Sequence, residues 1–149
     1  MRVETRVATF GELDPVTLYA ILKLRVDVFV VEQKCAYPEL DGRDTEPGTR
    51  HLSIEQDGQI LAYLRILDEG DKQRIGRVLT AENARGTGLG KRLMTEALAI
   101  VGERDSVLDA QAYLARFYEG FGYRQTGPEY VEDGIPHIPM VREATPPAR

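Results

Sequence analysis

The sequence predicts an α/β (α+β) fold, a single domain in which helices flank a mixed, mostly antiparallel sheet. Length and composition suit this class, because 149 residues with 42% hydrophobic and 29% charged residues are ordinary for one globular domain. Hairpin signals surround Asp57-Gly58, and helical spacing of apolar residues appears before and after them. A glycine-rich turn at residues 85–90 joins a predicted strand to a predicted helix, and the crossover to the next strand predicts one parallel pair.

The first third of the chain predicts a strand, a helix and a long loop. Residues 3–9 alternate in polarity, as a strand does. Asp14-Pro15 is a helix-start signal, with aspartate as N-cap and proline at the first helical position. This helix is predicted to run to about Val28, because Phe29-Val30-Val31 breaks its periodicity. Residues 32–50 are polar and rich in proline and glycine, so they predict a long loop, which in a compact domain tends to be functional or mobile.

The remaining elements follow from turn residues and apolar spacing. Asp-Gly is a preferred two-residue hairpin turn, and Gly120 ends a short helix at its C′ position. We expect strands at 51–56, 59–67, 73–80, 106–110, 123–126 and 137–143, and helices at 88–101 and 112–119. The whole chain, 1–149, is expected to be one domain, with a core of about 3–143 and a tail, 144–149, marked by Pro146 and Pro147.

Charge and composition narrow the class of protein. The net charge of −5 argues against a general nucleic-acid binder. The N-terminus lacks the apolar core of a signal peptide and no apolar run is long enough to span a bilayer, so we expect a cytoplasmic protein without a membrane partner. Cys35 is the single cysteine and the two histidines are far apart in sequence, so we expect neither a disulfide nor a metal site.

The glycine-rich turn has the features of an anion-binding site. Gly86, Gly88 and Gly90 lack a Cβ, so their backbone N–H groups can approach a ligand closely. The turn precedes a helix, whose first N–H groups are unsatisfied and lie at the positive end of the helix dipole. Arg85 and Lys91 add positive charge on either side, and together these features favour phosphate as the anion.

Two phosphate-binding patterns do not fit this turn, which disfavours a nucleotide-binding fold. A P-loop requires a glycine five residues before its Gly-Lys pair, where this chain has Arg85, and Ser or Thr after the pair, where it has Arg92. The dinucleotide pattern G-x-G-x-x-G has a different second spacing, and the strand before this turn follows a hairpin. A third pattern, Arg/Gln-x-x-Gly-x-Gly/Ala between a strand and a helix, fits Arg85 to Gly90 in full.

That third pattern resembles the signature with which GCN5-related N-acetyltransferases (the GNAT family) bind the pyrophosphate of acetyl-coenzyme A. The predicted order of elements resembles the fold of the same family. Phe117–Tyr123 resembles its later motif A-x-x-F-Y-x-x-x-G-F/Y, although Leu114 replaces the alanine. Further segments, in order, resemble the ElaA-like branch: Leu24–Gln33, Tyr37-Pro38, Asp41-Gly42, Arg50-His51, Tyr63–Leu67, Ala110–Ala112 and Glu132–Met140.

The resemblance implies acetyl-coenzyme A as co-substrate, lying where two splayed central strands part. The backbone of Val78, Leu79 and Thr80 would hold the pantetheine arm, with one N–H group facing the thioester oxygen. The residues implied for the pyrophosphate are Arg85, Gly86, Thr87, Gly88, Leu89, Gly90 and Lys91. Tyr118 would be the general acid for the departing thiolate, and the alternative is a core aromatic residue like Phe117.

The acceptor side of the site carries weaker signals. Glu32 follows an apolar helix end and is the candidate general base, with a solvated surface glutamate as the alternative. The residues expected near the acceptor are Arg25, His51, Arg65, Gln111 and His137. Either histidine can instead be structural at the start of a strand, and Gln111 either bonds across the splay or caps the sheet. Arg25 and Arg65 lie in apolar segments, so we expect both to be paired, with Glu32 or Asp41 as candidate partners.

These features favour an N-acetyltransferase in which a primary amine attacks acetyl-coenzyme A directly in a ternary complex. The acceptor would be a small molecule or a protein lysine, and the sequence is compatible with a homodimer. Segments expected to rim the cleft carry Asp41, Asp44, Glu129, Glu132 and Asp133. Such a rim favours a cationic amine, unless these charges are simply solvated. The alternative function is a non-catalytic acyl-coenzyme A-binding or sensing module, which would need Arg85–Gly90 but neither Tyr118 nor a base.

Overall fold

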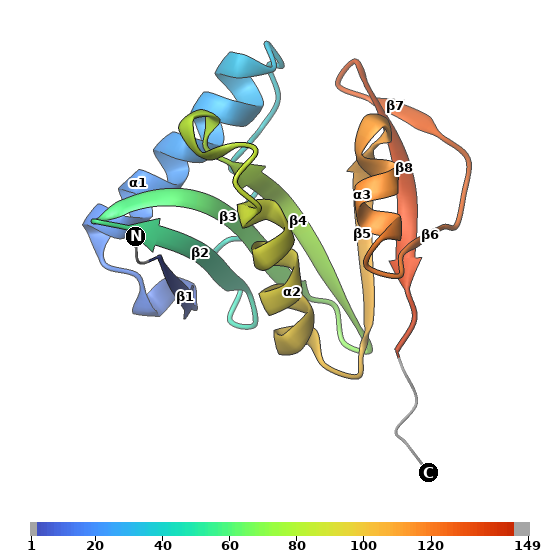
Figure 1. Ribbon diagram of the computed structural model, residues 1–149, viewed down its shortest axis with the longest axis horizontal. Coiled ribbons are helices and arrows are strands. Elements are labelled where there is room, and N and C mark those ends of the chain that lie inside the picture. Colours follow the sequence, from blue (N-terminus) through green and yellow to red (C-terminus); the bar gives the residue numbers. More distant parts are fainter. Residues whose placement is uncertain (1–2, 145–149) are drawn as a thin grey trace.

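The computed structural model describes residues 3–144, which form one domain around a mixed eight-stranded sheet (Figure 1). The strands lie in the order β1-β2-β3-β4-β5-β8-β6, and β7 pairs with β8. Only β4 and β5 are parallel neighbours among these described strands; every other pair is antiparallel. The predicted fold class is therefore confirmed.

The bounds of the elements are as follows. The strands are β1 (Glu4–Ala8), β2 (Arg50–Gln56), β3 (Gln59–Asp68), β4 (Lys72–Thr80), β5 (Asp105–Gln111), β6 (Arg124–Gln125), β7 (Tyr130–Glu132) and β8 (Ile135–Arg142). The helices are α1 (Pro15–Val26), α2 (Leu89–Val101) and α3 (Ala115–Glu119). Four short helical segments are η1 (Phe10–Glu12), the π-helix η2 (Asp27–Glu32), η3 (Glu82–Ala84) and η4 (Ala112–Leu114). Within residues 3–144, no helix is both long enough and apolar enough to cross a membrane.

Two hydrophobic clusters cover opposite faces of the sheet. Leu93 of α2 and Leu64 of β3 belong to the larger cluster, which also receives α3. Ile21 of α1 and Tyr63 of β3 belong to the smaller cluster. Tyr63 and Leu64 are adjacent in β3, and adjacent residues of a strand point to opposite faces of the sheet. The helix α1 therefore lies on one face, and α2 and α3 lie on the other.

The sheet opens between its two parallel central strands. β4 and β5 pair only over Lys72–Arg74 and Asp105–Val107, and beyond these residues the strands diverge toward the top of Figure 1. The edge of β4 that faces β5 therefore has no strand partner from Ile75 onward. Unpaired strand edges present backbone N–H and C=O groups that can bind an extended ligand.

A β-bulge bends β4 beside this opening. Tyr63 pairs with Leu79 and Arg65 pairs with Gly76, so two residues of β4, Arg77 and Val78, stand opposite one residue of β3. Arg77 has φ = +53°, a left-handed conformation that is unfavourable for a residue with a long side chain. A conformation of this kind persists only where surrounding contacts fix it.

Most local sequence signals match the structure. Asp14 Oδ1 accepts a hydrogen bond from the backbone N–H of Thr17 at 2.8 Å, which confirms the predicted N-cap of α1. The predicted Asp57-Gly58 hairpin turn is also confirmed, with positive φ at both residues (+51° and +78°), as a type I′ turn requires.

The structure differs from expectation at two places. The first helix does not stop near Val28 but continues as the π-helix η2 to Glu32. Strand β7 and the start of β8 were not expected, although Asp133-Gly134 forms the same kind of turn as Asp57-Gly58, with φ of +52° and +77°. The proline pair expected in the tail, at 146–147, lies outside the described residues.

The long loop between η2 and β2 is fixed by a partly buried arginine–carboxylate cluster, formed by Arg25, Arg65, Arg77, Glu39, Asp41 and Asp44. Arg25 is 0% exposed; its Nε lies 2.5 Å from Glu39 Oε2 and its Nη1 lies 2.7 Å from Asp44 Oδ1. Arg65 bonds Asp41 and Asp44, so its expected pairing with Asp41 is confirmed. Arg25 is paired as expected, but with loop carboxylates and not with Glu32 or Asp41.

We expect the Arg25→Ala variant to lose about 3–5 kcal/mol of unfolding free energy, because Glu39 and Asp44 would remain buried without a cation that they share. Urea unfolding would measure the loss. Arg124→Ala is the control, since it breaks an ion pair with Glu143 in which both side chains are more than half exposed; its loss should stay below about 1 kcal/mol. Equal losses for the two variants would contradict a structural role for the cluster.

Candidate active site

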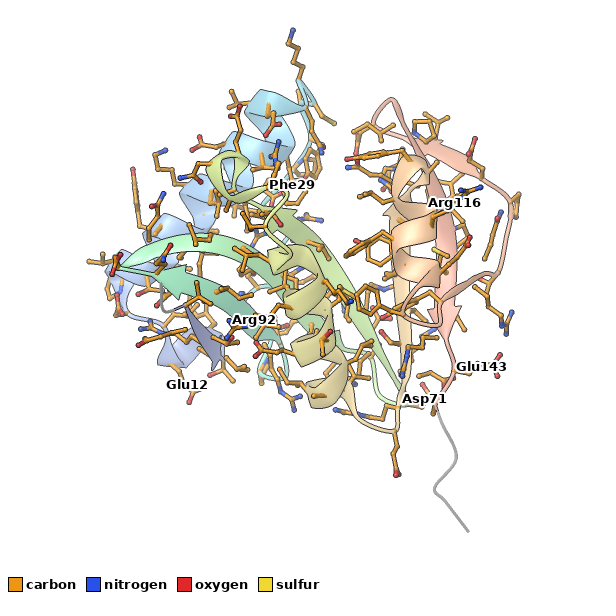
Figure 2. All side chains as sticks on the ribbon, viewed as in Figure 1. Glu12, Phe29, Asp71, Arg92, Arg116 and Glu143 are labelled. Carbon is orange, nitrogen blue, oxygen red and sulfur yellow. The ribbon has the colours of Figure 1, made fainter. Side chains whose placement is uncertain are left out.

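A cleft of about 1010 Å³ opens where β4 and β5 separate. Its floor is the Ile75–Thr80 part of β4, and its walls come from η2 on one side and from β5, α3 and the β7–β8 hairpin on the other. Phe29 of η2, labelled in Figure 2, lies at the edge of this opening. The cleft thus brings together segments that are separated by up to about a hundred residues in the sequence.

The glycine turn forms one end of the cleft. Gly86 and Gly88 have φ of +79° and +83°, and a Cβ on either would meet nothing within 4 Å. Backbone conformation, rather than packing, therefore favours glycine at these two positions. Gly88 is the N-cap of α2 and no side chain caps this helix, so the first-turn N–H groups are free to bind an anion.

The predicted cofactor residues converge on this cleft with one exception. The residues that line it are Val78, Leu79, Thr80, Arg85, Gly86, Gly88, Leu89, Gly90 and Lys91. Thr87 does not line it, because its hydroxyl donates a hydrogen bond back to the carbonyl of Ala84 and stabilises the turn from behind. A role of Thr87 in binding the cofactor therefore stays a prediction, and its side chain has a structural role in the turn.

Glu32 and Arg85 form an ion pair across the mouth of the cleft. Arg85 Nη1 and Nη2 lie 2.6 Å and 2.7 Å from the two carboxylate oxygens of Glu32, and both side chains are 41% exposed. The hydrogen bonds from Arg85 hold the pKa of Glu32 below its usual value. The predicted general base and the predicted phosphate-binding arginine are thus partners in this structure.

Tyr118 lies in the cleft wall, on α3. It is 5% exposed, and its ring packs edge to face against Phe117 and Tyr123 at centroid separations of 5.1 Å and 6.0 Å. Burial raises the pKa of the Tyr118 phenol, so its hydroxyl is protonated at neutral pH, as a general acid requires. The tyrosine is therefore both a packed aromatic residue and a group at the surface of the cleft.

The structure separates the five residues expected near the acceptor into two groups. Arg65, Gln111 and His137 line the cleft, and Gln111 Nε2 donates a hydrogen bond to Gln33 Oε1 at 3.3 Å across the splay. Arg25 and His51 do not line it, and both are buried. Neither can contact an acceptor there, so for these two residues the structure corrects the expectation.

His51 is a structural residue on β2. Its Nε2 lies 3.0 Å from the carbonyl oxygen of Asp44, which can only accept, so Nε2 carries the hydrogen. Its Nδ1 then accepts from the Tyr63 hydroxyl at 2.6 Å. Burial lowers the pKa of His51, which keeps the ring neutral. One ring nitrogen therefore holds the long loop and the other bonds the neighbouring strand β3, so neither is free for catalysis.

Some residues of the cleft carried no usable sequence signal. Arg77 lies there because of the bulge, with its guanidinium 5.4 Å from the centre of the Tyr37 ring. Cys35 also lines the cleft and its thiol donates to the carbonyl of Asp133 at 3.4 Å. Of the five carboxylates expected at the rim, Asp41, Glu132 and Asp133 line the cleft, whereas Asp44 is buried and Glu129 lies outside the lining.

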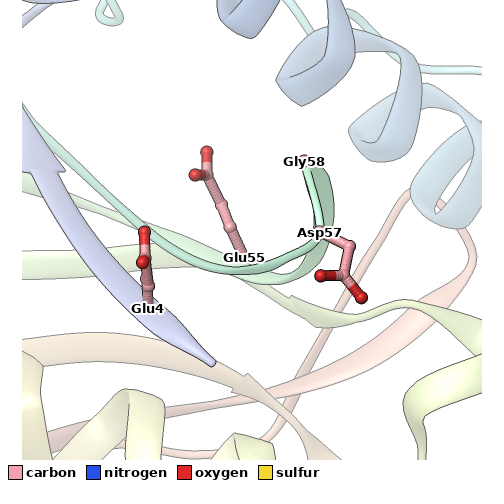
Figure 3. A pocket seen from close by; sticks show the side chains of 4 residues that line it. All are labelled: Glu4, Glu55, Asp57 and Gly58. Carbon is pink, nitrogen blue, oxygen red and sulfur yellow. The ribbon is translucent and has the colours of Figure 1, made fainter. Parts of the chain in front are cut away.

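A second, smaller depression of about 300 Å³ lies away from the cleft, at the β2–β3 turn. It is lined by Glu4, Glu55, Asp57 and Gly58, and Figure 3 shows the three carboxylates around it. Glu55 also pairs with Arg6 at 3.6 Å. Within residues 3–144, no three His, Cys, Asp or Glu side chains are grouped so that they could hold a metal ion. The cleft is therefore the better candidate for chemistry.

Comparison with known proteins identifies the class to which this fold and cleft belong. Residues 22–144 match the family model described as an acetyltransferase (GNAT) domain. The chain belongs to the GNAT family of acetyltransferases.

Relatives of this chain define its branch of the family. It is 51% identical to a UPF0039 protein of Mycobacterium bovis over 136 residues, covering 88% of this chain and 87% of the relative. It is 42% identical to Protein ElaA of Escherichia coli, covering 89% and 92%, and the crystal structure of that protein superimposes with a TM-score of 0.90 over 95% and 100% of the two chains. A structure described as an acyl-CoA N-acyltransferase from Pseudomonas aeruginosa superimposes with a TM-score of 0.91 at 42% identity, over 95% and 99%. These similarities confirm the prediction that the chain belongs to the ElaA-like branch of the family.

Proposed function

We propose that this chain transfers an acetyl group from acetyl-coenzyme A to a primary amine, by direct attack in a ternary complex. The observation that carries the proposal is the uncapped start of α2 at the glycine turn, which opens into the split between β4 and β5. The first feature suits a pyrophosphate and the second an extended pantetheine arm. The 42%-identical Pseudomonas protein described as an acyl-CoA N-acyltransferase supports the same class of donor.

The coenzyme would lie along the unpaired edge of β4. Arg85, Lys91 and the first-turn N–H groups of α2 would bind the pyrophosphate, and the backbone of Val78, Leu79 and Thr80 would bond the pantetheine arm like an added strand. One N–H group beyond the bulge would face the thioester oxygen. A fixed backbone donor at this place stabilises the oxyanion that forms when the amine attacks.

Tyr118 is proposed as the general acid. The departing thiolate of coenzyme A needs a proton, and the raised pKa of Tyr118 leaves its hydroxyl protonated until that moment. The Tyr118 side chain is fixed by its neighbours Phe117 and Tyr123, so little free energy is needed to orient it for the reaction.

Glu32 was the base expected from the sequence, and its role stays a proposal. Pyrophosphate and the Glu32 carboxylate are competing anions for the Arg85 guanidinium. Coenzyme binding at the turn would therefore release Glu32 at the mouth of the cleft, which Asp41, Glu132 and Asp133 also line. Asp41 is already paired with Arg65 and Arg77, but Glu132 and Asp133 form no salt bridge within residues 3–144. These two carboxylates favour a cationic acceptor such as a polyamine, a lysine side chain or an amino sugar.

Gly88→Ala should weaken coenzyme A binding about tenfold, measured by isothermal titration calorimetry. An L-residue at a left-handed φ costs about 1–2 kcal/mol, and the added Cβ would project where the phosphate is expected. Gly11→Ala is the matched control, because Gly11 lies in η1 outside the cleft and also has open space for a Cβ. Unchanged affinity in the Gly88 variant would place the phosphate elsewhere.

For Tyr118→Phe we expect turnover to fall by roughly tenfold or more, while the fold and the affinity for acetyl-coenzyme A are retained. The reason is that the ring packing survives and only the proton donor is lost. Steady-state kinetics with thiol detection would measure the change, and Tyr19→Phe, an exposed tyrosine on α1, is the control. A variant with normal turnover would remove Tyr118 from the mechanism.

A panel of amines tests the proposed function as a whole. Purified protein, acetyl-coenzyme A and each amine would be followed by thiol release, with a polyamine, a lysine peptide, an amino sugar and an anionic amino acid as acceptors. We expect acetylation of at least one cationic amine. Activity on the anionic acceptor alone would refute the cationic preference, and coenzyme binding without transfer to any amine would favour the sensing module.

A further inference from the structure

We propose that His137, at its Nε2 atom, is the group that takes the proton from the attacking amine. His137 lies on β8, in the wall of the cleft. It is the only one of the two histidines of the chain that lines the cleft. The inference rests on the proposed acyl transfer, and three features of the structure support it.

The first feature is a fixed tautomer. His137 Nδ1 lies 2.7 Å from the carbonyl oxygen of Ile135, and because a carbonyl only accepts, Nδ1 carries a hydrogen. In the neutral ring the lone pair is then on Nε2. Nε2 has no hydrogen-bond partner among the side chains and backbone of residues 3–144. The ring therefore presents one basic nitrogen that no protein group occupies.

The second feature is a fixed ring plane. The imidazole stacks on the ring of Tyr130, with centroids 5.7 Å apart and planes 21° from parallel. Tyr130 is also its register partner across the β7–β8 hairpin. A stacking contact and a backbone hydrogen bond together restrict both side-chain torsions, so the base needs little reorientation during the reaction.

The third feature is the face of the sheet on which His137 lies. On β5, Leu108 and Ala110 face the cluster under α2 and α3, so Gln111 points to the opposite, α1 side. His137 is directly opposite Gln111 across the β5–β8 pair, and such pairs share a face. The hydrogen bond from Gln111 to Gln33, just after η2, agrees with this side.

This placement puts the acid and the base on opposite sides of the split sheet. Tyr118 belongs to the cluster under α2 and α3, on the side where the glycine turn would hold the coenzyme. The remaining approach to the thioester is from the α1 side, where His137 lies. An amine entering there would meet His137 Nε2, while the thiolate would leave toward Tyr118.

Two carboxylates near this side are less suited to take the proton. Asp41 is bonded by Arg65 and Asp109 by Arg74, and a carboxylate held by arginine is a weak base. Glu32, which coenzyme binding would release from Arg85, is the rival base, and the Glu32→Gln variant below compares the two. Glu132 and Asp133 lie on the same hairpin as Tyr130 and His137, and Asp109 lies on β5, the strand that pairs with β8.

The proposed step balances as follows. The neutral amine nitrogen attacks the thioester carbon, a C–N bond forms, and the carbonyl electron pair moves to oxygen. Nε2 of His137 takes one proton from that nitrogen. The C–S bond breaks as the carbonyl re-forms, and the thiolate takes the proton of Tyr118. Solvent returns the proton from His137 to the Tyr118 phenolate, leaving an amide, a free thiol and both side chains unchanged.

His137→Asn tests the proposal, because an asparagine amide can still donate to the Ile135 carbonyl but has no basic nitrogen. With a cationic amine that the wild-type protein acetylates, we expect kcat to fall by about 10²-fold or more and the affinity for acetyl-coenzyme A to stay within about twofold. The kcat/KM profile of the variant should lose the acidic limb that the wild-type profile shows. A merely structural histidine would not remove that limb.

Two comparisons make the outcome decisive. Val131→Thr, an exposed position on the same hairpin, should retain full activity. Glu32→Gln should keep more activity than His137→Asn; the reverse order, or wild-type kcat and pH profile in His137→Asn, would overturn the proposal. Independently of activity, ¹⁵N NMR of the imidazole should show hydrogen on Nδ1 and a lone pair on Nε2. A wild-type protein that acetylates no amine overturns the proposed function, and this inference with it.

Discussion

Three arginines and three carboxylates, gathered between α1, β3, β4 and the long loop, set the geometry of the cleft. Four of them, Arg25, Arg65, Glu39 and Asp44, are buried. Burying a charge costs several kcal/mol per ion in lost hydration, and only mutual pairing offsets that cost. Each of the three arginines contacts two of the three carboxylate residues, so the six side chains form one connected network and not three separate salt bridges. The loop consequently has one favourable position against the sheet.

This cluster also explains the strained backbone of β4. Arg77 adopts its left-handed conformation while its guanidinium bonds Glu39 and lies over the Tyr37 ring. Contacts of that kind can offset a backbone strain of order 1–3 kcal/mol. The bulge then directs the following backbone, Val78 to Thr80, into the opening of the sheet. A loop on the acceptor side is thereby coupled to the strand that is proposed to hold the thioester.

The sequence predicted best those features that depend on the conformation of a short stretch of backbone. The glycine turn and the Asp57-Gly58 hairpin need particular residues at adjacent positions, so their patterns could be recognised directly. The β7–β8 hairpin was missed although Asp133-Gly134 carries the same signal, because β7 is only three residues long and Pro136 and Pro139 weaken the strand signal of β8. Partners such as Arg25 and Asp44 are set by tertiary packing, and no local pattern reveals them.

The π-helix η2 has a consequence for how this segment tolerates changes in length. A π-turn accommodates an extra residue relative to an α-helix, and each residue of an α-helix turns the chain by about 100°. Deleting one residue between Asp27 and Glu32 would let α1 continue as a regular helix, and the residues after the deletion would keep nearly the same phase, so that Glu32 and Gln33 could still face Arg85 and Gln111. The π-turn therefore absorbs one residue of length while the end of the helix stays aligned with partners more than fifty residues later.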